Sequence, residues 1–136
     1  MGSLASASDQ RAAPVRMPPH LVDAHRIPPL GHDEAAALAT TELDRFLDLL
    51  RTLEVDDWRT PTVCSLWDVR QVVAHVTGAA ASYARWPEMA RQWSPRRQRR
   101  YRWTGLSLLD ALNQIQVDDR AAASPAALMA ELQEVG

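Results

Sequence analysis

The stretch Trp67-Asp-Val-Arg-Gln-Val-Val-Ala-His75 begins an amphipathic helix near the middle of the chain. Apolar residues continue along it at intervals of three and four, which is the helical period rather than the alternation of a strand. This stripe comprises Val69, Val72, Val73, Val76, Ala80 and Tyr83. Two pairs have the spacing of a capping box, Ser65 with Asp68 and Asp68 with Gln71, so we expect the helix to begin near one of them. Pro87 ends this helix or offsets its next turn.

A longer helix precedes this stretch. Asp33 is a good N-cap with Glu34 in the first turn, and we expect the helix to run from about Asp33 to Leu53. Its apolar face follows the helical spacing and comprises Leu43, Phe46, Leu47, Leu50 and Leu53. Trp58 and Trp67 bracket the connector between the two helices, and we expect both to anchor it to the core.

Two further helices follow. Ser107 with Asp110 predicts the start of a third helix, whose apolar residues are Leu108, Leu109, Leu112, Ile115 and Val117. Ser124-Pro125 predicts the start of a fourth, with Leu128, Met129 and Leu132 on one face. The fourth has about three turns before Gly136, against about six in the first. We therefore predict an all-α, up-down helical bundle that is truncated in or after its fourth helix.

The composition excludes several classes of protein. Residues 1–32 hold five of the nine prolines, so we expect a flexible arm there and a helical bundle over residues 33–136. A net charge of −2, from 15 basic and 17 acidic residues, argues against nucleic-acid binding through overall charge. The single cysteine excludes an intramolecular disulfide, and no apolar run approaches the roughly 20 residues that span a bilayer. Every basic residue is arginine, which excludes a lysine base. We expect a cytoplasmic protein with no membrane partner and no secretory signal.

His75 is the strongest candidate for a site residue. At 100° per residue it lies roughly 110° from the centre of the valine stripe, on the flank of the buried face. There it can be a metal ligand or a general base, or a histidine at the edge of the core with one hydrogen-bonded nitrogen. A catalytic zinc needs about three protein ligands, and no second histidine or acidic residue four positions away accompanies His75. The residues alone leave these interpretations open.

Other candidates also have two interpretations. Cys64 precedes a helix N-terminus and could be a thiolate ligand or nucleophile, or a small apolar residue packed under Trp67. His20, His25 and His32 form a loose cluster in the arm, where nothing in the sequence would preorganise a metal site.

Residues 85–102 carry a strong local charge. Seven arginines oppose one acid, Glu88, which gives +6 and leaves −8 for the rest of the chain. The run from Arg96 to Trp103 interleaves arginine with aromatic residues, so it could bind nucleic acid or could be a connector that pairs with the acidic remainder. We expect the connector, and no nucleic-acid partner. In Asp118-Asp119-Arg120, we expect one acid to support the arginine and the other to face water.

The segment that ends at His75 resembles a motif of a known family. Its residues Trp58-Arg-Thr-Pro61-Thr-Val-Cys64-Ser-Leu-Trp67-Asp-Val-Arg70-Gln-Val-Val-Ala-His75 are similar to W-x-x-P-T-x-C-x-x-W-x-V-R-x-V-x-A-H in the mycothiol-dependent maleylpyruvate isomerase family. That family belongs to the DinB-like four-helix-bundle metalloproteins. The segments that begin at His32, Glu42, Asp110 and Ser124 fit the family more loosely, and the resemblance covers about residues 28–135.

The resemblance implies a function and a site. His75 falls on the family's divalent-metal ligand, usually for zinc, and mycothiol is the implied thiol cosubstrate. The family's other ligands, an acidic residue and a histidine four positions apart, lie on a later helix that nothing in this chain matches. Members commonly have an acid at the position of Gln71, so this chain departs from the pattern there. The implied reaction is thiol addition to an electrophilic substrate followed by bond rotation and elimination, or else thiol transfer.

Two functions from different classes follow from these observations. The first is a metal- and mycothiol-dependent isomerase or thiol transferase, of which this chain is an N-terminal portion. The second is a non-catalytic helical binding or regulatory module that lacks the metal site. For the first we expect a small-molecule thiol and an electrophilic substrate as partners, and a homodimer is one assembly that the sequence allows.

Overall fold

Six α-helices and one 3₁₀ turn make up the part of the chain that the structure describes. The structure is a computed structural model, and it describes residues 26–136. Most of the predicted arm, including His20 and His25, lies outside the described residues. The elements are α1 (His32–Arg51), η2 (Asp57–Arg59), α2 (Val69–Ala84), α3 (Trp86–Gln92), α4 (Pro95–Arg102), α5 (Leu108–Asp119) and α6 (Pro125–Val135). The predicted all-α class is confirmed.

The helix starts follow the capping residues closely. Of the two starts open for α2, the structure has the second, because Asp68 is the N-cap and forms a complete capping box with Gln71. The side chains of Ser107 and Ser124 cap α5 and α6 as predicted. The first helix differs slightly, since α1 begins at His32 and ends at Arg51, two residues before the predicted end.

The arginine-rich segment contains two short helices where we predicted only a connector. Both α3 and α4 have a proline in their first turn, Pro87 and Pro95, where the fixed φ angle favours a helix start and the missing N–H costs nothing. Pro87 therefore belongs to the beginning of a new helix, and α2 has already ended at Ala84.

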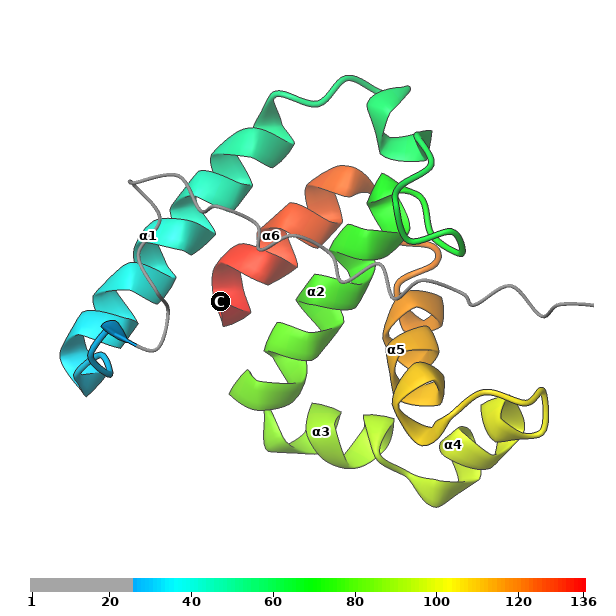
Figure 1. Cartoon of the computed structure of the whole chain (residues 1–136). Coiled ribbons are helices and arrows are strands. Elements are labelled where there is room, and N and C mark those ends of the chain that lie inside the picture. The colour runs from blue at the N-terminus through cyan, green and yellow to red at the C-terminus, as the bar shows by residue number, and fades with distance from the viewer. Residues whose placement is uncertain (1–25) are drawn as a thin grey trace, which may run out of the picture. The chain divides into compact units, whose positions relative to one another are not determined.

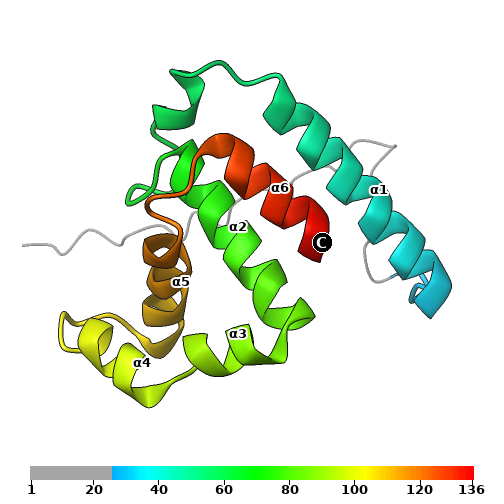
Figure 2. The same ribbon diagram turned by 180° about the vertical axis from the view of Figure 1, so that it is seen from behind.

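Within His32–Gly136, α2 occupies the centre (Figure 1). It packs against α5 and α3 and against α6, and α6 in turn contacts α1. The view from behind shows the same order, with α6 lying between α1 and α2 (Figure 2). The short helices α3 and α4 lead from the end of α2 to α5, and both of them contact α5.

An apolar cluster joins α1, η2, α2 and α6. Its buried members are Leu47, Leu50, Trp58, Val73, Ala74, Leu128 and Leu132. The predicted apolar faces of α1 and α6 and the anchoring role of Trp58 are thus confirmed. The stripe predicted for α2 is wrong at Tyr83, which is 89% exposed, and that for α5 is wrong at Leu108 and Leu109, which are also exposed. No helix within residues 26–136 is both long and apolar enough to cross a membrane.

Candidate functional site

The loop before α2 places an aromatic ring against His75. Thr62 holds this loop closed, because its backbone N–H and its hydroxyl both donate to the Trp67 carbonyl, at 3.3 and 2.8 Å. The capping box then turns the chain directly into α2. As a result, the Trp67 ring lies two turns before His75 with its centroid 5.1 Å from the imidazole, tilted by 36°.

His75 is half-buried and lines a pocket of about 270 Å³ between α2, α3 and α5. The pocket also contains Met89, Trp93 and Asn113, and its walls are mostly apolar. The Nδ1 atom of His75 lies 2.8 Å from Oε1 of Gln116 on α5. The predicted position of His75 at the edge of the buried face agrees with this arrangement.

Gln116 belongs to a chain of side-chain amides, which we call the amide chain. Gln92 Nε2 donates to the Gly78 carbonyl at 2.9 Å and to Glu88 Oε1 at 2.7 Å. Gln116 Nε2 donates to Gln92 Oε1 at 2.9 Å, and Gln116 Oε1 then faces His75. Both glutamines are buried, so each has few alternative partners.

The amide chain sets the proton position on His75. A backbone carbonyl and a carboxylate can only accept, so Gln92 must present its NH₂ group to Gly78 and Glu88. Its oxygen must then face the NH₂ group of Gln116, and the oxygen of Gln116 must face His75. Nδ1 of His75 is therefore the donor. In the neutral imidazole this leaves the lone pair on Nε2, which is the state that a metal ligand or a base requires.

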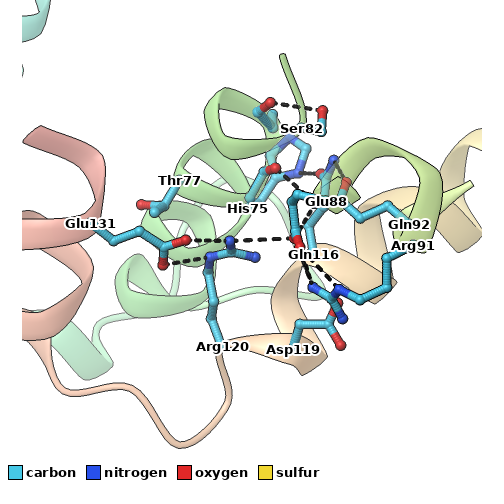
Figure 3. Close-up of polar contacts among 12 residues, drawn as sticks. His75, Thr77, Ser82, Glu88, Arg91, Gln92, Gln116, Asp119, Arg120 and Glu131 are labelled. Atoms are coloured by element: carbon cyan, nitrogen blue, oxygen red, sulfur yellow. Dashed lines mark hydrogen bonds and ion pairs between the residues drawn. The ribbon is translucent and has the colours of Figure 1, made fainter. Parts of the chain in front are cut away.

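Next to the amide chain lies a group of charged residues, the ion-pair cluster (Figure 3). Arg120 is only 7% exposed and donates to Glu131 through Nε at 3.0 Å and through a terminal nitrogen at 2.6 Å. Arg91 bonds Glu88 at 2.7 Å and lies 2.8 Å from Asp119. The cluster comprises three arginines and three acids, Arg91, Arg97, Arg120, Glu88, Asp119 and Glu131. The charges therefore balance, as buried charges require.

Glu88 connects the ion-pair cluster to the amide chain, and its environment favours the carboxylate. Burial raises the pKa of Glu88, but hydrogen bonds from Arg91 and Gln92 and the nearby arginine charges outweigh it, so the net pKa is lowered. The resulting contribution to stability is present above the ordinary value of 4.5 and is lost as the pH falls through the lowered value. At neutral pH, Glu88 is thus the acceptor that the orientation of Gln92 requires.

The metal implied by the family needs ligands beyond His75. The remaining lining residues of its pocket include none of the types that usually hold zinc. Over residues 26–136, no three residues among His, Cys, Asp and Glu come together as a potential metal-binding group. His75 fits one ligand position with its Nε2 lone pair, and the other residues that line its pocket offer no second.

Gln71 and Cys64 make no hydrogen bond to His75. The Gln71 side chain accepts from the Asp68 backbone N–H at 2.9 Å, so it stabilises the start of α2, and His75 is supported from α5 instead. Cys64 is exposed rather than packed under Trp67, so that interpretation was wrong. It lines a separate pocket of about 400 Å³ with Trp67 and Asn113.

The third residue of the predicted histidine cluster, His32, is exposed at the first position of α1, where its Nδ1 lies 3.5 Å from Asp33. Of the expectation for Asp118-Asp119-Arg120, the support of the arginine by one acid was wrong, because neither carboxylate forms an ion pair with it, whereas Asp118 is exposed as expected for the other. Asp119 pairs with Arg91 and Arg97, while Asp118 accepts from the Tyr101 hydroxyl at 2.6 Å.

Part of the arginine-rich segment pairs with acids elsewhere in the chain, as we expected for a connector. Arg91 and Arg97 contact Asp119, and Arg85 contacts Glu134 on α6 at 2.6 Å. Arg96, Arg99, Arg100 and Arg102 are exposed and have no ion pair with any described residue. Ion pairs with acidic residues of the described part of the chain thus account for three of the seven arginines in the segment.

The sequence pattern did not predict the roles of Gln92, Gln116 and Glu131. A weak signal existed for Gln116, which lies four residues after Leu112 and so shares a face with a core residue of α5. Gln92 and Glu131 had no comparable signal, because the contacts of Gln92 with Gly78 and Gln116 span 14 and 24 residues, and that of Glu131 with Arg120 spans 11.

Comparison with protein-family models gives a match over residues 39–136, to the model described as the mycothiol maleylpyruvate isomerase N-terminal domain. The match includes α2 to α6 and most of α1. No curated protein and no solved structure matched the chain.

Proposed function

The chain belongs to the mycothiol maleylpyruvate isomerase N-terminal domain family, and we propose that it is a domain of a metal- and mycothiol-dependent isomerase or thiol transferase. In this proposal His75 is one metal ligand. The observation that carries this proposal is the amide chain, which directs the Nδ1 proton of His75 toward Gln116 and leaves Nε2 free. Metal-bound histidines characteristically donate their other ring nitrogen in this way.

The residues of this chain would orient and shield the site. Trp67 lies against one side of the imidazole, and Gln116 prevents the ring from turning over. The apolar walls of the pocket, among them Met89 and Trp93, would limit access of water to Nε2. A bound divalent ion, which we propose to be zinc, would lower the pKa of a coordinated thiol.

The proposal implies small-molecule partners. The family is mycothiol-related, and we propose mycothiol as the thiol and an electrophilic compound as the second substrate. We further propose a cytoplasmic location, where thiols stay reduced, and keep a homodimer as a hypothesis.

The test is the zinc content of the natural polypeptide, including any residues that follow Gly136. We expect about one zinc per chain by elemental analysis, and His75→Ala should lose it. His32→Ala is the matched control, since His32 is fully exposed and distant from the pocket residues in sequence, and it should keep the metal. Isomerisation of maleylpyruvate should require mycothiol in the wild type and be lost in His75→Ala.

A second candidate function is a non-catalytic helical binding module. It is favoured by the pocket lining, in which no residue other than His75 is a usual zinc ligand. This function predicts no zinc in the wild type after reconstitution and an unchanged fold in His75→Ala. Equal zinc in the wild type and in His75→Ala would refute the ligand assignment outright.

A further inference from the structure

A third pocket, of about 700 Å³, lies between α4 and the loop that leads into α5. This volume is within the range of small-molecule sites. His75 does not line it, although Trp93 forms part of its wall and of the wall of the His75 pocket. Two features of its lining point to one class of ligand.

The first feature is positive charge without a protein partner. Arg99 and Arg102 line the pocket from one face of α4, three residues apart. Neither has a carboxylate within ion-pair distance among the described residues, in contrast to Arg91 and Arg97. Guanidinium groups in this position suit a carboxylate, which they bind with two parallel hydrogen bonds.

The second feature is a pair of exposed indole rings. Trp93 is 49% exposed and Trp103 is 76% exposed, and both line the pocket. The Arg99 guanidinium carbon lies 4.7 Å from the centroid of the Trp103 ring, so a charged and an aromatic surface meet there. Exposed aromatic side chains that line a hollow are typical of sites that bind planar, apolar ligands.

We propose that this pocket binds an aromatic carboxylate. The carboxylate contacts Arg99 and Arg102, and the ring packs against Trp93 and Trp103. The site is independent of the metal proposed for His75.

The experiment measures binding of 4-hydroxybenzoate to the whole chain by isothermal titration calorimetry. The test variant is Arg99→Gln with Arg102→Gln. The matched control is Arg96→Gln with Arg100→Gln, which removes the same charge from the same helix at positions outside the pocket. All four arginines lie on the eight-residue helix α4. Circular dichroism of each variant should show that it folds.

We expect saturable binding that weakens at least tenfold in the test variant and less than twofold in the control. The methyl ester of 4-hydroxybenzoate, which lacks the carboxylate, should bind at least tenfold more weakly. Equal losses in the two double variants, or no saturable binding to the wild type, would overturn the proposal.

Discussion

The apolar cluster and the polar contacts around His75 both pack against α2 but are built on different principles. The cluster uses Val73 and Ala74 of α2 with leucines from α1 and α6, and its members need only shape and apolar character. The amide chain and the ion-pair cluster use Gln92, Gln116 and Arg120, each of which needs a partner at one distance and in one direction.

This difference shows which contacts determine the orientation of the site residues. An apolar side chain tolerates a neighbour of similar volume, whereas a buried amide or guanidinium is destabilising unless each polar atom is paired. The orientation of His75 depends on the second kind of contact, so a substitution there should alter the site even where the helices still pack.

The largest effect is expected in the apolar cluster. Leu128 is fully buried between α6 and its neighbours, so Leu128→Ala should lower the free energy of unfolding by about 4 kcal/mol through lost burial and the cavity left behind. Leu49, which is 57% exposed on α1, gives the control. Leu49→Ala should cost about 0.5 kcal/mol in urea denaturation, and equal costs would contradict the observed packing.

Two glutamates on α6 test how much a buried and a surface ion pair each contribute to stability. Glu131 pairs with buried Arg120, whereas Glu134 pairs with Arg85 at the surface. Glu131→Gln should cost about 3 kcal/mol because it removes the nearer counter-ion of a buried guanidinium, which keeps only Glu88 at 3.6 Å. Glu134→Gln should cost less than about 1 kcal/mol, as surface ion pairs do. Chemical denaturation at neutral pH measures both, and similar costs would show that Arg120 is not effectively buried.

At Gly78, helix propensity and packing against α5 predict opposite effects of an alanine substitution on the free energy of unfolding. Glycine to alanine inside a helix normally stabilises by up to about 1 kcal/mol. A Cβ atom at Gly78, however, would lie 2.6 Å from Cβ of Gln116 and 2.9 Å from a terminal nitrogen of Arg120. Gly78→Ala should therefore cost about 2 kcal/mol. It should also shift the NMR signals of the His75 ring, and a stabilised variant would contradict the close approach of α2 and α5.

The smallest effect concerns Tyr101. Burial, together with the hydrogen bond to Asp118 and that carboxylate's charge, raises the pKa of Tyr101 to about 12. Tyr101→Phe should cost about 1 kcal/mol at pH 8. Because the folded pKa lies above the ordinary 10.0, this contribution is complete below pH 10 and is lost as the pH rises toward 12.

The difference in absorbance at 295 nm between wild type and Tyr101→Phe, followed against pH, should give a midpoint near 12. A midpoint near 10 would mean that the Tyr101 hydroxyl does not donate to Asp118 in solution.

Local patterns in the sequence were sufficient for α1, α2, α5 and α6, for the capping residues that start the last three of these, and for most of the apolar cluster, but not for α3 and α4. Asp68, Ser107 and Ser124 cap helices through contacts within three residues, and the leucine spacing of α1 shows which face packs. These features depend on neighbours along the chain, so a periodic pattern records them. The position of His75 at the edge of that face followed in the same way.

Only tertiary packing determined which polar groups meet. Gln116, the hydrogen-bond partner of His75, is 41 residues away, and Arg120 pairs with Glu131 rather than with the adjacent Asp119. Such pairs depend on how helices approach one another and on which atoms lose contact with water, and a one-dimensional pattern carries neither. The sequence therefore identified His75 as a candidate ligand, and the fold supplied the contacts that orient it.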